Sequence, residues 1–509
     1  MSETTDVVIV GAGPTGLLLA IELVLGGARV VVVERLMERD LTVKAGAMGA
    51  LAGEALERRG LRATIAAEEQ RGRSAMTAMA KMPNASFSAP LPWQKIGGHF
   101  AGLFLIDQSR QREPGRRFRG VRQQALEKML VDRAQELGIE VRTGVEVQDF
   151  TESAEGVEVR AQGPEGELRF SCAYLVGCDG GRSAIRKRAG FEFPGTDPTL
   201  TGHQAIVELD YPDRLLPLGW RRTPRGMMAY GPVPGRVITV EFDGPPADRT
   251  SPITMEEVER SLRWVSGADV RILSMESATR FTDHARQVTS YRHGRILLAG
   301  DAAHVHSPFG GQGLNLGLLD AVNLGWKLAA VARGRQPESL LDTYTAERHP
   351  VGARVLANTR AQVALMRPDE MTTALREIVA DLMSLEEGTR FFGEMMSGLT
   401  ERYPLGEGHA QLGRICGNIA IPTEDGPEDL TTLMLDGNAL LIDAGGQGSP
   451  LREIAAAWWP RVRVVRATQG PSMLLRPDAC IAWISEESDA AGLKAALEQW
   501  FGLPLVPAG

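Results

Sequence analysis

The sequence has few cysteines, and its cysteines and histidines show no metal-binding spacing. Four cysteines occur in 509 residues, none of them in a CxxC pair, and the eight histidines form no HExxH pattern. Few and unpaired cysteines are typical of a reducing compartment, and the missing spacing argues against a structural zinc site. We therefore expect a cytoplasmic protein whose functional site contains no metal.

Excess positive charge and uninterrupted apolar runs are also missing. The formal net charge is -8, from 56 lysines and arginines against 64 acidic residues. This balance gives no basic surface for nucleic acid or for an anionic membrane, so neither is an expected partner. The apolar run 7–33 could span a bilayer by length, but five glycines, a proline and two charged residues interrupt it, which excludes a transmembrane helix. Residues 1–6 contain two acidic and no basic residues, which is unlike a signal peptide.

A strand–helix–strand pattern opens the chain. An apolar strand at 6–10 leads into GAGPTG, a helical run at 17–25 and a second apolar strand at 29–33. This order of elements around GxGxxG is the context in which the motif binds a dinucleotide.

Each residue of this motif has a physical role. Gly11 allows the tight turn, Gly13 lets the backbone approach a pyrophosphate, and Gly16 lets the helix pack closely on the strand. Glu34, at the end of the second strand, can accept a hydrogen bond from a ribose 2′-hydroxyl. The pattern therefore predicts a bound dinucleotide.

A second strand–loop–helix pattern lies at 294–333. A short apolar strand at 296–299 ends at Gly300-Asp301, and a loop with Pro308 and three glycines leads to a helix near Leu314. A carboxylate suits a sugar hydroxyl, and free amides at a helix N-terminus favour electron-rich groups. The pattern predicts a cradle for a polyol chain that ends in an electron-rich ring.

Three motifs together resemble the class A FAD-dependent aromatic hydroxylases of the para-hydroxybenzoate hydroxylase fold, above all the bacterial aromatic polyketide hydroxylases. They are GAGPTG with Glu34-Arg35, GCDGGRSAIRKRAG at 177–190, and GDAAHVHSPFGGQGLNLGLLDAVNLGWKLA at 300–329. The second matches the family's DG motif, which contacts FAD and the nicotinamide cofactor, and the third matches its GD motif and flavin loop. The resemblance covers about residues 5–390.

Two further positions follow from the resemblance. The stretch 41–60 is similar to the family segment beside the ribityl chain, with Lys44 where the family usually has arginine, and Gln123 matches a glutamine that reaches FAD from the start of a helix predicted at 121–137. The FAD-binding residues that the resemblance implies are Gly11, Gly13, Pro14, Thr15, Gly16, Glu34, Arg35, Lys44, Gln123, Asp179, Asp301, Pro308, Gly311, Gln312, Gly313, Leu314 and Asn315.

The implied fold is α/β, with a Rossmann-type FAD-binding domain, an inserted and mostly antiparallel β-sheet substrate domain, and a C-terminal thioredoxin-like α/β domain without CxxC. The expected bounds are 1–190 with 280–395, then 191–279 with part of 75–120, and 400–509. Within 191–279, runs at 204–209, 226–230 and 236–242 read as strands and 254–265 reads as a helix. Candidate liners of the substrate pocket, each also suited to a plain core position, are Trp220, Met227, Met228, Tyr230 and Phe242.

The resemblance implies an FAD- and NAD(P)H-dependent monooxygenase. NADPH or NADH would bind transiently, since there is one dinucleotide fingerprint, and O₂ would form a flavin C4a-hydroperoxide that hydroxylates a polycyclic aromatic, polyketide-type substrate. Baeyer–Villiger or ring-rearranging chemistry on a similar substrate stays open as the alternative. We assign no catalytic side chain, because His304 and His306 beside the GD loop fit a structural role equally well.

Two segments stay open to more than one interpretation. The arginine-rich run 110–119 is either a solvated surface or an entry route for the NADPH phosphate. The C-terminal region has a lone Cys480, so packing or a homodimer contact is a better expectation than a redox role.

Overall fold

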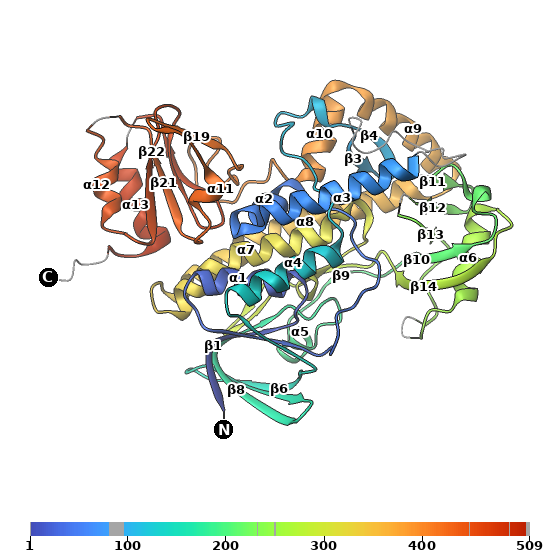
Figure 1. Ribbon diagram of the computed structural model, residues 1–509, viewed down its shortest axis with the longest axis horizontal. Helices are drawn as coiled ribbons and strands as arrows, with labels where there is room; N and C mark the ends of the chain where they lie inside the picture. Colours follow the sequence, from blue (N-terminus) through green and yellow to red (C-terminus); the bar gives the residue numbers. More distant parts are fainter. Residues whose placement is uncertain are drawn as a thin grey trace.

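The computed structural model describes residues 2–80, 96–231, 233–248, 251–446, 448–487 and 489–504. A mainly parallel sheet with helices packed on it forms the centre of the molecule. A separate antiparallel sheet lies at one end and a C-terminal α/β unit at the other (Figure 1). None of the helices in these ranges is long and apolar enough to cross a membrane.

The central sheet has the strand order β16-β17-β8-β1-β2-β5, in which all neighbours except the edge pair β16–β17 are parallel. Its strands are β1 (Glu3–Val10), β2 (Val30–Glu34), β5 (Glu140–Thr143), β8 (Gly166–Gly177), β16 (Arg292–His293) and β17 (Ile296–Leu298). The predicted motifs follow directly after β1, β8 and β17. Because parallel strands end at the same edge of a sheet, the fold brings the three motifs together.

Residues 140–152 form two strands, β5 and β6 (Glu146–Glu152), because Gly144 has a φ of 71° and turns the chain between them. β6 then pairs with β7 (Val157–Gly163), which pairs with β8.

Helix α1 (Pro14–Leu25) lies beside α7 (Gln312–Ala332), the helix that follows the GD loop (Figure 1). The two backbones approach closely because Gly325 has no side chain, and an added Cβ there would lie 2.2 Å from the Cβ of Glu22. Helix α4 (Gln123–Glu136) packs on α1, while α2 (Ala50–Leu56) contacts α7 and is joined to α3 (Arg62–Ala80) through a kink at Gly60, where φ is 90°. The N-termini of α1 and α7 thus belong to one packed unit.

The second sheet has the order β11-β12-β13-β10-β14 and is antiparallel. The predicted strands appear as β10 (Thr201–Leu209), β12 (Gly226–Tyr230) and β13 (Arg236–Glu241), whereas β11 (Gly219–Thr223) and β14 (Ile272–Phe281) were not predicted. Helix α6 (Met255–Ser266) starts after Thr254, whose side chain accepts a hydrogen bond from the Glu257 amide. It covers one face of the sheet and leaves the other free for the site.

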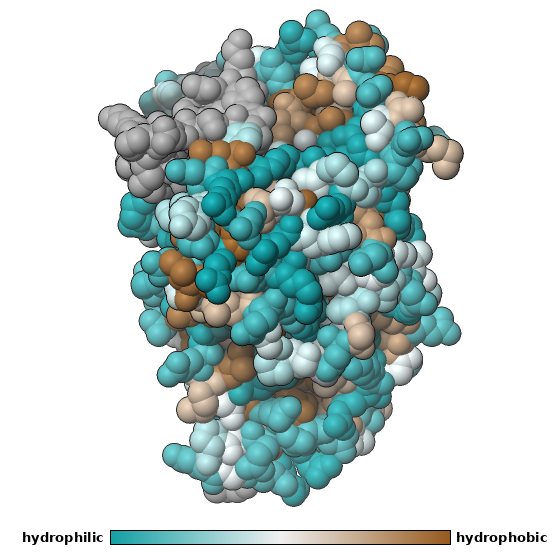
Figure 2. Space-filling view, turned by 90° about the vertical axis from the view of Figure 1, so that its right-hand side faces the viewer, coloured by the Kyte–Doolittle hydropathy of each residue, from teal (hydrophilic) through white to brown (hydrophobic). Residues whose placement is uncertain are grey.

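Three helices close the other side of the site. They are α8 (Asp342–Met366), α9 (Glu370–Ser384) and α10 (Glu386–Ser397), and the hairpin of β3 (Ile96–Phe100) and β4 (Leu103–Asp107) packs on α10. Residues 81–95 of the segment expected to join the substrate domain lie outside the described residues. Figure 2 shows a mostly hydrophilic face with apolar patches in its upper part, where Figure 1 places α9 and α10.

The C-terminal unit is a four-stranded sheet, ordered β22-β21-β23-β24, with α12 (Leu451–Ala456) and α13 (Ala490–Phe501) packed beside it. Its strands are β21 (Ala439–Asp443), β22 (Val462–Arg466), β23 (Ser472–Leu475) and β24 (Ile481–Ser485). This is the predicted α/β arrangement, with Cys480 buried and unpaired.

A buried ionic network attaches this unit to the centre of the molecule. Arg476 donates to Glu347 of α8 at 2.7 and 2.8 Å and to Asp478 at 2.6 Å, while Lys327 of α7 donates to the same glutamate at 2.9 Å. All four side chains are almost completely buried. The network therefore connects the helix that follows the flavin loop to the C-terminal unit.

Candidate active site

A cavity of about 2280 Å³ extends from the carboxyl edge of the central sheet to the free face of the antiparallel sheet. All three predicted motifs contribute to its wall. The predicted cofactor residues that line it are Gly13, Pro14, Thr15, Lys44, Gln123, Asp301, Pro308, Gly311, Gly313 and Leu314. The remaining predicted residues, which do not line it, are Gly11, Gly16, Glu34, Arg35, Asp179, Gln312 and Asn315.

The three glycines of the first motif occupy different environments. An added Cβ would lie 2.4 Å from the Cys178 carbonyl oxygen at Gly11, where φ is 108°, and 2.0 Å from the Gly11 carbonyl oxygen at Gly16. At Gly13 it would meet nothing within 4 Å, because this residue faces the cavity. Gly13 is also the N-cap of α1, which has no side-chain cap, so the first amides of that helix are free for an anionic group.

Glu34 is bound to its own turn. One carboxylate oxygen accepts a hydrogen bond from the Ala12 amide at 2.9 Å and the other accepts from the Leu36 amide at 2.9 Å. These bonds fix the carboxylate beside the GxGxxG turn but leave lone pairs on both oxygens. Contact with a ribose hydroxyl remains a prediction for Glu34, and the neighbouring Arg35 is exposed.

Asp301 faces the cavity from the short 3-10 turn after β17. Its side chain is accessible from the cavity and forms no hydrogen bond with another described residue. Protein nevertheless surrounds it, and this desolvation raises the pKa of the Asp301 carboxyl above its ordinary value. A hydroxyl that entered the cavity and donated to Asp301 would offset this cost.

Asp320 of α7 holds the turn in place, a role that the sequence analysis did not recognise. Its carboxylate accepts hydrogen bonds from the Gly300 amide at 3.1 Å and from Arg348 Nε at 2.7 Å, and it pairs with His304 Nε2 at 2.7 Å. His304 and Asp320 are completely buried, which favours a structural role for His304. The signal available in the sequence was the position of Asp320, about two turns into the helix after the flavin loop.

The start of α7 also faces the cavity with free amides. Gly311 is the N-cap with a φ of 63° and no side-chain cap, and an added Cβ would meet nothing within 4 Å. Asn315 braces this loop, since its side chain accepts from the Gly49 amide at 2.6 Å and donates to the Gly311 carbonyl at 2.8 Å. Gln312 is buried and donates to the Met396 carbonyl at 3.4 Å. These two predicted residues support the loop instead of lining the cavity.

The DG motif is anchored by Asp179. One of its carboxylate oxygens accepts from the amides of Ala184 at 2.7 Å and Ile185 at 3.2 Å, and the other is buried without a partner in the described part of the chain. Arg186 donates to the carbonyls of Ala302 and Gly181 at 2.9 Å, so the DG and GD motifs are joined directly. Gly180 and Arg186 line the cavity next to Asp179.

The antiparallel sheet contributes one row of residues to the cavity. Trp220, Ala229, Ile238, Gln204 and Thr279 lie opposite one another across the five strands. All of them except Ala229 line the cavity. The prediction for Trp220 therefore agrees with its position, and the row adds polar and apolar groups that sequence reasoning missed.

The other four predicted pocket liners do not line the cavity. Met228 and Tyr230 lie on the opposite face of β12 and pack with the residues under α6, because side chains alternate along a strand. Met227 is on the cavity face but packs in the cluster around Phe309, and Phe242 packs against the same cluster. The side that α6 covers decided the positions of Met228 and Tyr230, and a strand pattern alone does not reveal which side that is.

Aromatic rings form the wall next to this row. Phe309 contacts Trp220 and Phe281 edge to face, with ring centroids 6.2 and 6.0 Å apart. His99 packs 5.0 Å from Phe104 and 6.2 Å from Trp220. Such rings present a flat, apolar surface for an aromatic ligand.

Two histidines in this wall are neutral at physiological pH. Burial lowers the pKa of both His99 and His306 to about 4. His306 Nδ1 lies 2.8 Å from the Ser307 carbonyl, which can only accept, so the neutral ring carries its proton on Nδ1. Its Nε2 is then an acceptor, and it is buried without a partner among the described residues.

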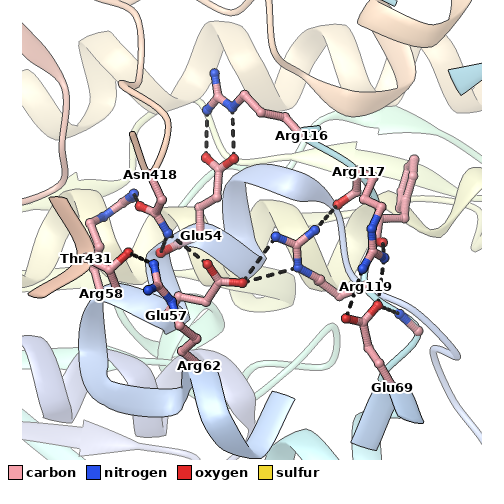
Figure 3. Close-up of polar contacts among 12 residues, drawn as sticks. Glu54, Glu57, Arg58, Arg62, Glu69, Arg116, Arg117, Arg119, Asn418 and Thr431 are labelled. Atoms are coloured by element: carbon pink, nitrogen blue, oxygen red, sulfur yellow. Dashed lines mark hydrogen bonds and ion pairs between the residues drawn. The ribbon is translucent and has the colours of Figure 1, made fainter. Parts of the chain in front are cut away.

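The arginine-rich run 110–119 is largely neutralised by acidic residues of α2 and α3 (Figure 3). Arg116 pairs with Glu54 at 2.7 Å, Arg117 with Glu69 at 2.7 Å, and Arg119 with Glu57, one residue beyond α2, at 3.2 Å. Asn418, from the chain that leads to the C-terminal unit, donates to Glu57 at 2.9 Å. These contacts favour a structural role over a site for the NADPH phosphate.

The cavity fits FAD by its chemistry. Free amides at the starts of α1 and α7 would hold a pyrophosphate and an electron-rich ring, and the unpaired Asp301 carboxylate between the motifs would hold a ribityl hydroxyl. Comparison with known proteins agrees. The model of the "FAD binding domain" family matches residues 4–359, and the "Aromatic-ring hydroxylase, C-terminal" model matches 409–504. The chain belongs to the FAD-dependent aromatic-ring hydroxylases.

Individual relatives are similar over the whole length of this hydroxylase. A 12-dehydrotetracycline 5-monooxygenase/anhydrotetracycline 6-monooxygenase of Streptomyces rimosus is 41% identical, over 98% of this chain and 99% of the relative. A rifampicin monooxygenase of Streptomyces venezuelae is 38% identical over 98% of each chain. The solved structure of OxyS anhydrotetracycline hydroxylase from Streptomyces rimosus aligns with a TM-score of 0.84 and 40% identity, covering 98% of this chain and 100% of that one. The hydroxylase is therefore an FAD-dependent monooxygenase, with NADPH or NADH as the electron donor typical of its family.

Proposed function

We propose that this hydroxylase adds one oxygen atom from O₂ to a polycyclic aromatic substrate of the polyketide type. The observation that carries the proposal is the aromatic wall of Phe104, Trp220, Phe281 and Phe309, in the same cavity as the cofactor cradle. At about 2280 Å³ the cavity exceeds the roughly 300–1,000 Å³ of a single small-ligand site, so it has room for a second, flat ligand beside FAD. The printed names of the relatives, which refer to tetracyclines and rifampicin, favour substrates of this size.

Bound FAD would supply the electron transfer and the activation of oxygen. The protein's contribution is orientation, exclusion of water and electrostatics. The free amides at the start of α7, next to Gly311, would stabilise negative charge on a ring placed against them. Asp301 would hold the polyol chain, and the neutral rings of His99 and His306 would add no charge to the aromatic part of the wall.

The experiment is turnover of the FAD-loaded enzyme with NADPH or NADH and a panel of polycyclic phenols, with products identified by mass spectrometry. Addition of one oxygen atom to an aromatic carbon is the expected result. Because Baeyer–Villiger insertion adds the same mass, the position of the new oxygen is assigned by NMR. If NAD(P)H is consumed but every polycyclic probe is recovered unchanged, the proposed substrate class is wrong. A cytoplasmic location and a homodimer stay predictions.

A further inference from the structure

Arg236 is a cavity-lining cation without a carboxylate partner in the described part of the chain. Two other arginines of the wall are paired with carboxylates, Arg280 with Glu257 at 2.6 Å and Arg286 with Asp197 at 2.5 Å. Among the described residues, Nε of Arg236 is buried without a partner, and the one hydrogen bond of the guanidinium runs from Nη2 to the Gln204 side-chain oxygen at 2.8 Å. An uncompensated cation in a partly dry cavity favours an anionic ligand.

The guanidinium lies at the boundary between the cofactor side and the substrate side of the cavity. Arg236 begins β13 and faces the same side of the sheet as Ile238, two residues on, which belongs to the row along the cavity. Its Nη1 lies 3.6 Å from where a Cβ on Gly46 would be, in the stretch 43–47. Gln204 joins the antiparallel sheet to this stretch, because its side-chain NH₂ donates to the Val43 carbonyl at 2.7 Å.

The charged groups around Arg236 leave its charge uncompensated. Burial alone lowers the pKa of the Arg236 guanidinium, and no described ionisable group contributes to the change. The stretch 43–47 contains one ionisable residue, Lys44, which pairs with Asp40 at 3.0 Å. On β10, His203 precedes Gln204, so its side chain lies on the face of the strand opposite to Gln204 and the cavity. There it pairs with Glu257.

We propose that Arg236, oriented by Gln204, binds an ionised oxygen of the substrate, a phenolate or an enolate. The substrates would then be acidic hydroxylated polycycles, bound as anions, and not neutral polycyclic hydrocarbons or ethers. The inference rests on the proposed function and adds the charge state and the anchoring residue. A guanidinium fork suits this task because it offers several donors with fixed geometry to one oxyanion or to two neighbouring oxygens.

The test uses a matched pair of probes, 2-hydroxyanthraquinone and its methyl ether, 2-methoxyanthraquinone. Each is titrated into the FAD-loaded enzyme without NAD(P)H, at a pH below and a pH above the phenol's own pKa, and binding is followed by the change in flavin absorbance. We expect the hydroxy probe to bind at least about tenfold more tightly above its pKa, the size of one charge-assisted hydrogen bond. The ether should bind equally at both pH values.

Three variants assign the effect to Arg236. Arg236→Gln should lose the pH difference and keep its affinity for the ether, whereas Arg236→Lys should retain a weaker preference for the anion, because it keeps the charge without the fork. Arg280→Gln is the matched control, since that arginine lines the same cavity but is already paired, and it should keep the pH difference. FAD content and thermal stability are measured for every variant.

The outcomes separate the inference from the proposed function. An undiminished pH difference in Arg236→Gln, or none in the unmodified enzyme, overturns the role of Arg236 even if both probes bind. If Arg236→Gln does not fold, the test rests on Arg236→Lys. An anion preference in that variant equal to that of the unmodified enzyme would contradict binding of the anion by the guanidinium geometry. If neither probe binds at either pH, the polycyclic substrate class itself fails, and the inference fails with it.

Discussion

Replacement of Asp301 by asparagine should move cofactor affinity and apoprotein stability in opposite directions. Asparagine has nearly the same shape but no charge, so the ribityl hydroxyl would lose a charge-assisted hydrogen bond and keep a neutral one. The difference is about 1 to 1.5 kcal/mol, which corresponds to an FAD Kd about five- to tenfold higher. Asp301→Ala removes this hydrogen bond altogether and should raise the Kd about ten- to a hundredfold.

The apoprotein should respond the other way because desolvation raises the pKa of the Asp301 carboxyl above the ordinary value of 3.8. The folded apoprotein then holds this proton more tightly than the unfolded chain does. Its stability therefore falls as the pH rises from the ordinary pKa through the raised one. Asp301→Asn removes this loss, so the apo variant should unfold at a higher temperature than the apo parent at pH 7.

Fluorescence titration of the apoproteins with FAD and thermal unfolding with and without FAD check both effects. Asp132→Asn is a suitable control, since Asp132 forms an exposed ion pair with Lys128 on α4 and should leave both quantities unchanged. If apo Asp301→Asn is less stable than the parent at pH 7, the carboxylate has a stabilising partner within the protein. Unchanged FAD affinity in both Asp301 variants would remove the ribityl assignment.

Three further changes test other parts of the site. Gly13→Val should abolish FAD binding, since its side chain would project into the cavity where the pyrophosphate is expected, and a yellow purified variant would contradict this. Asp179→Ala should slow NAD(P)H-driven flavin reduction in stopped flow while FAD is retained; an unchanged reduction rate would leave Asp179 with only its structural contacts to the start of α5 (Ala184–Arg188). Arg476→Met should destabilise the protein to urea by about 3–5 kcal/mol, because it leaves buried carboxylates unpaired, and a loss below about 1 kcal/mol would show that the network is not stabilising.

The sequence by itself determined the cofactor half of the site. Backbone glycines and short turns build it, and their requirements are local. Gly11 needs its positive φ and Gly16 its missing side chain wherever a strand, a tight turn and a helix follow one another in this way. The three motifs also follow strands, and parallel strands end at one edge, so their meeting in space could be expected from the sequence.

The tertiary structure alone decided which side chains reach the substrate half. Met227 and Met228 are neighbours with the same chemistry, yet one packs beside Phe309 and the other under α6. Strand alternation says that the two point to opposite faces, but not which face a helix from elsewhere in the chain will cover. For this reason the predicted liners Met228 and Tyr230 lie away from the cavity, and the row through Gln204 and Ile238 was missed. Met227 and Phe242 instead pack in the cluster around Phe309.

The charged residues are visible in the sequence, but only the tertiary structure shows which of them are paired. The sequence displays Arg116, Arg117 and Arg119 as a basic run, but only the fold places Glu54, Glu57 and Glu69 opposite them. Arg236, which stands alone between Gly235 and Val237, gives no such signal in the sequence, yet it lies at the cavity without a carboxylate partner among the described residues. A charge is compensated by whatever lies within a few ångströms in space, and separation along the chain does not determine that distance.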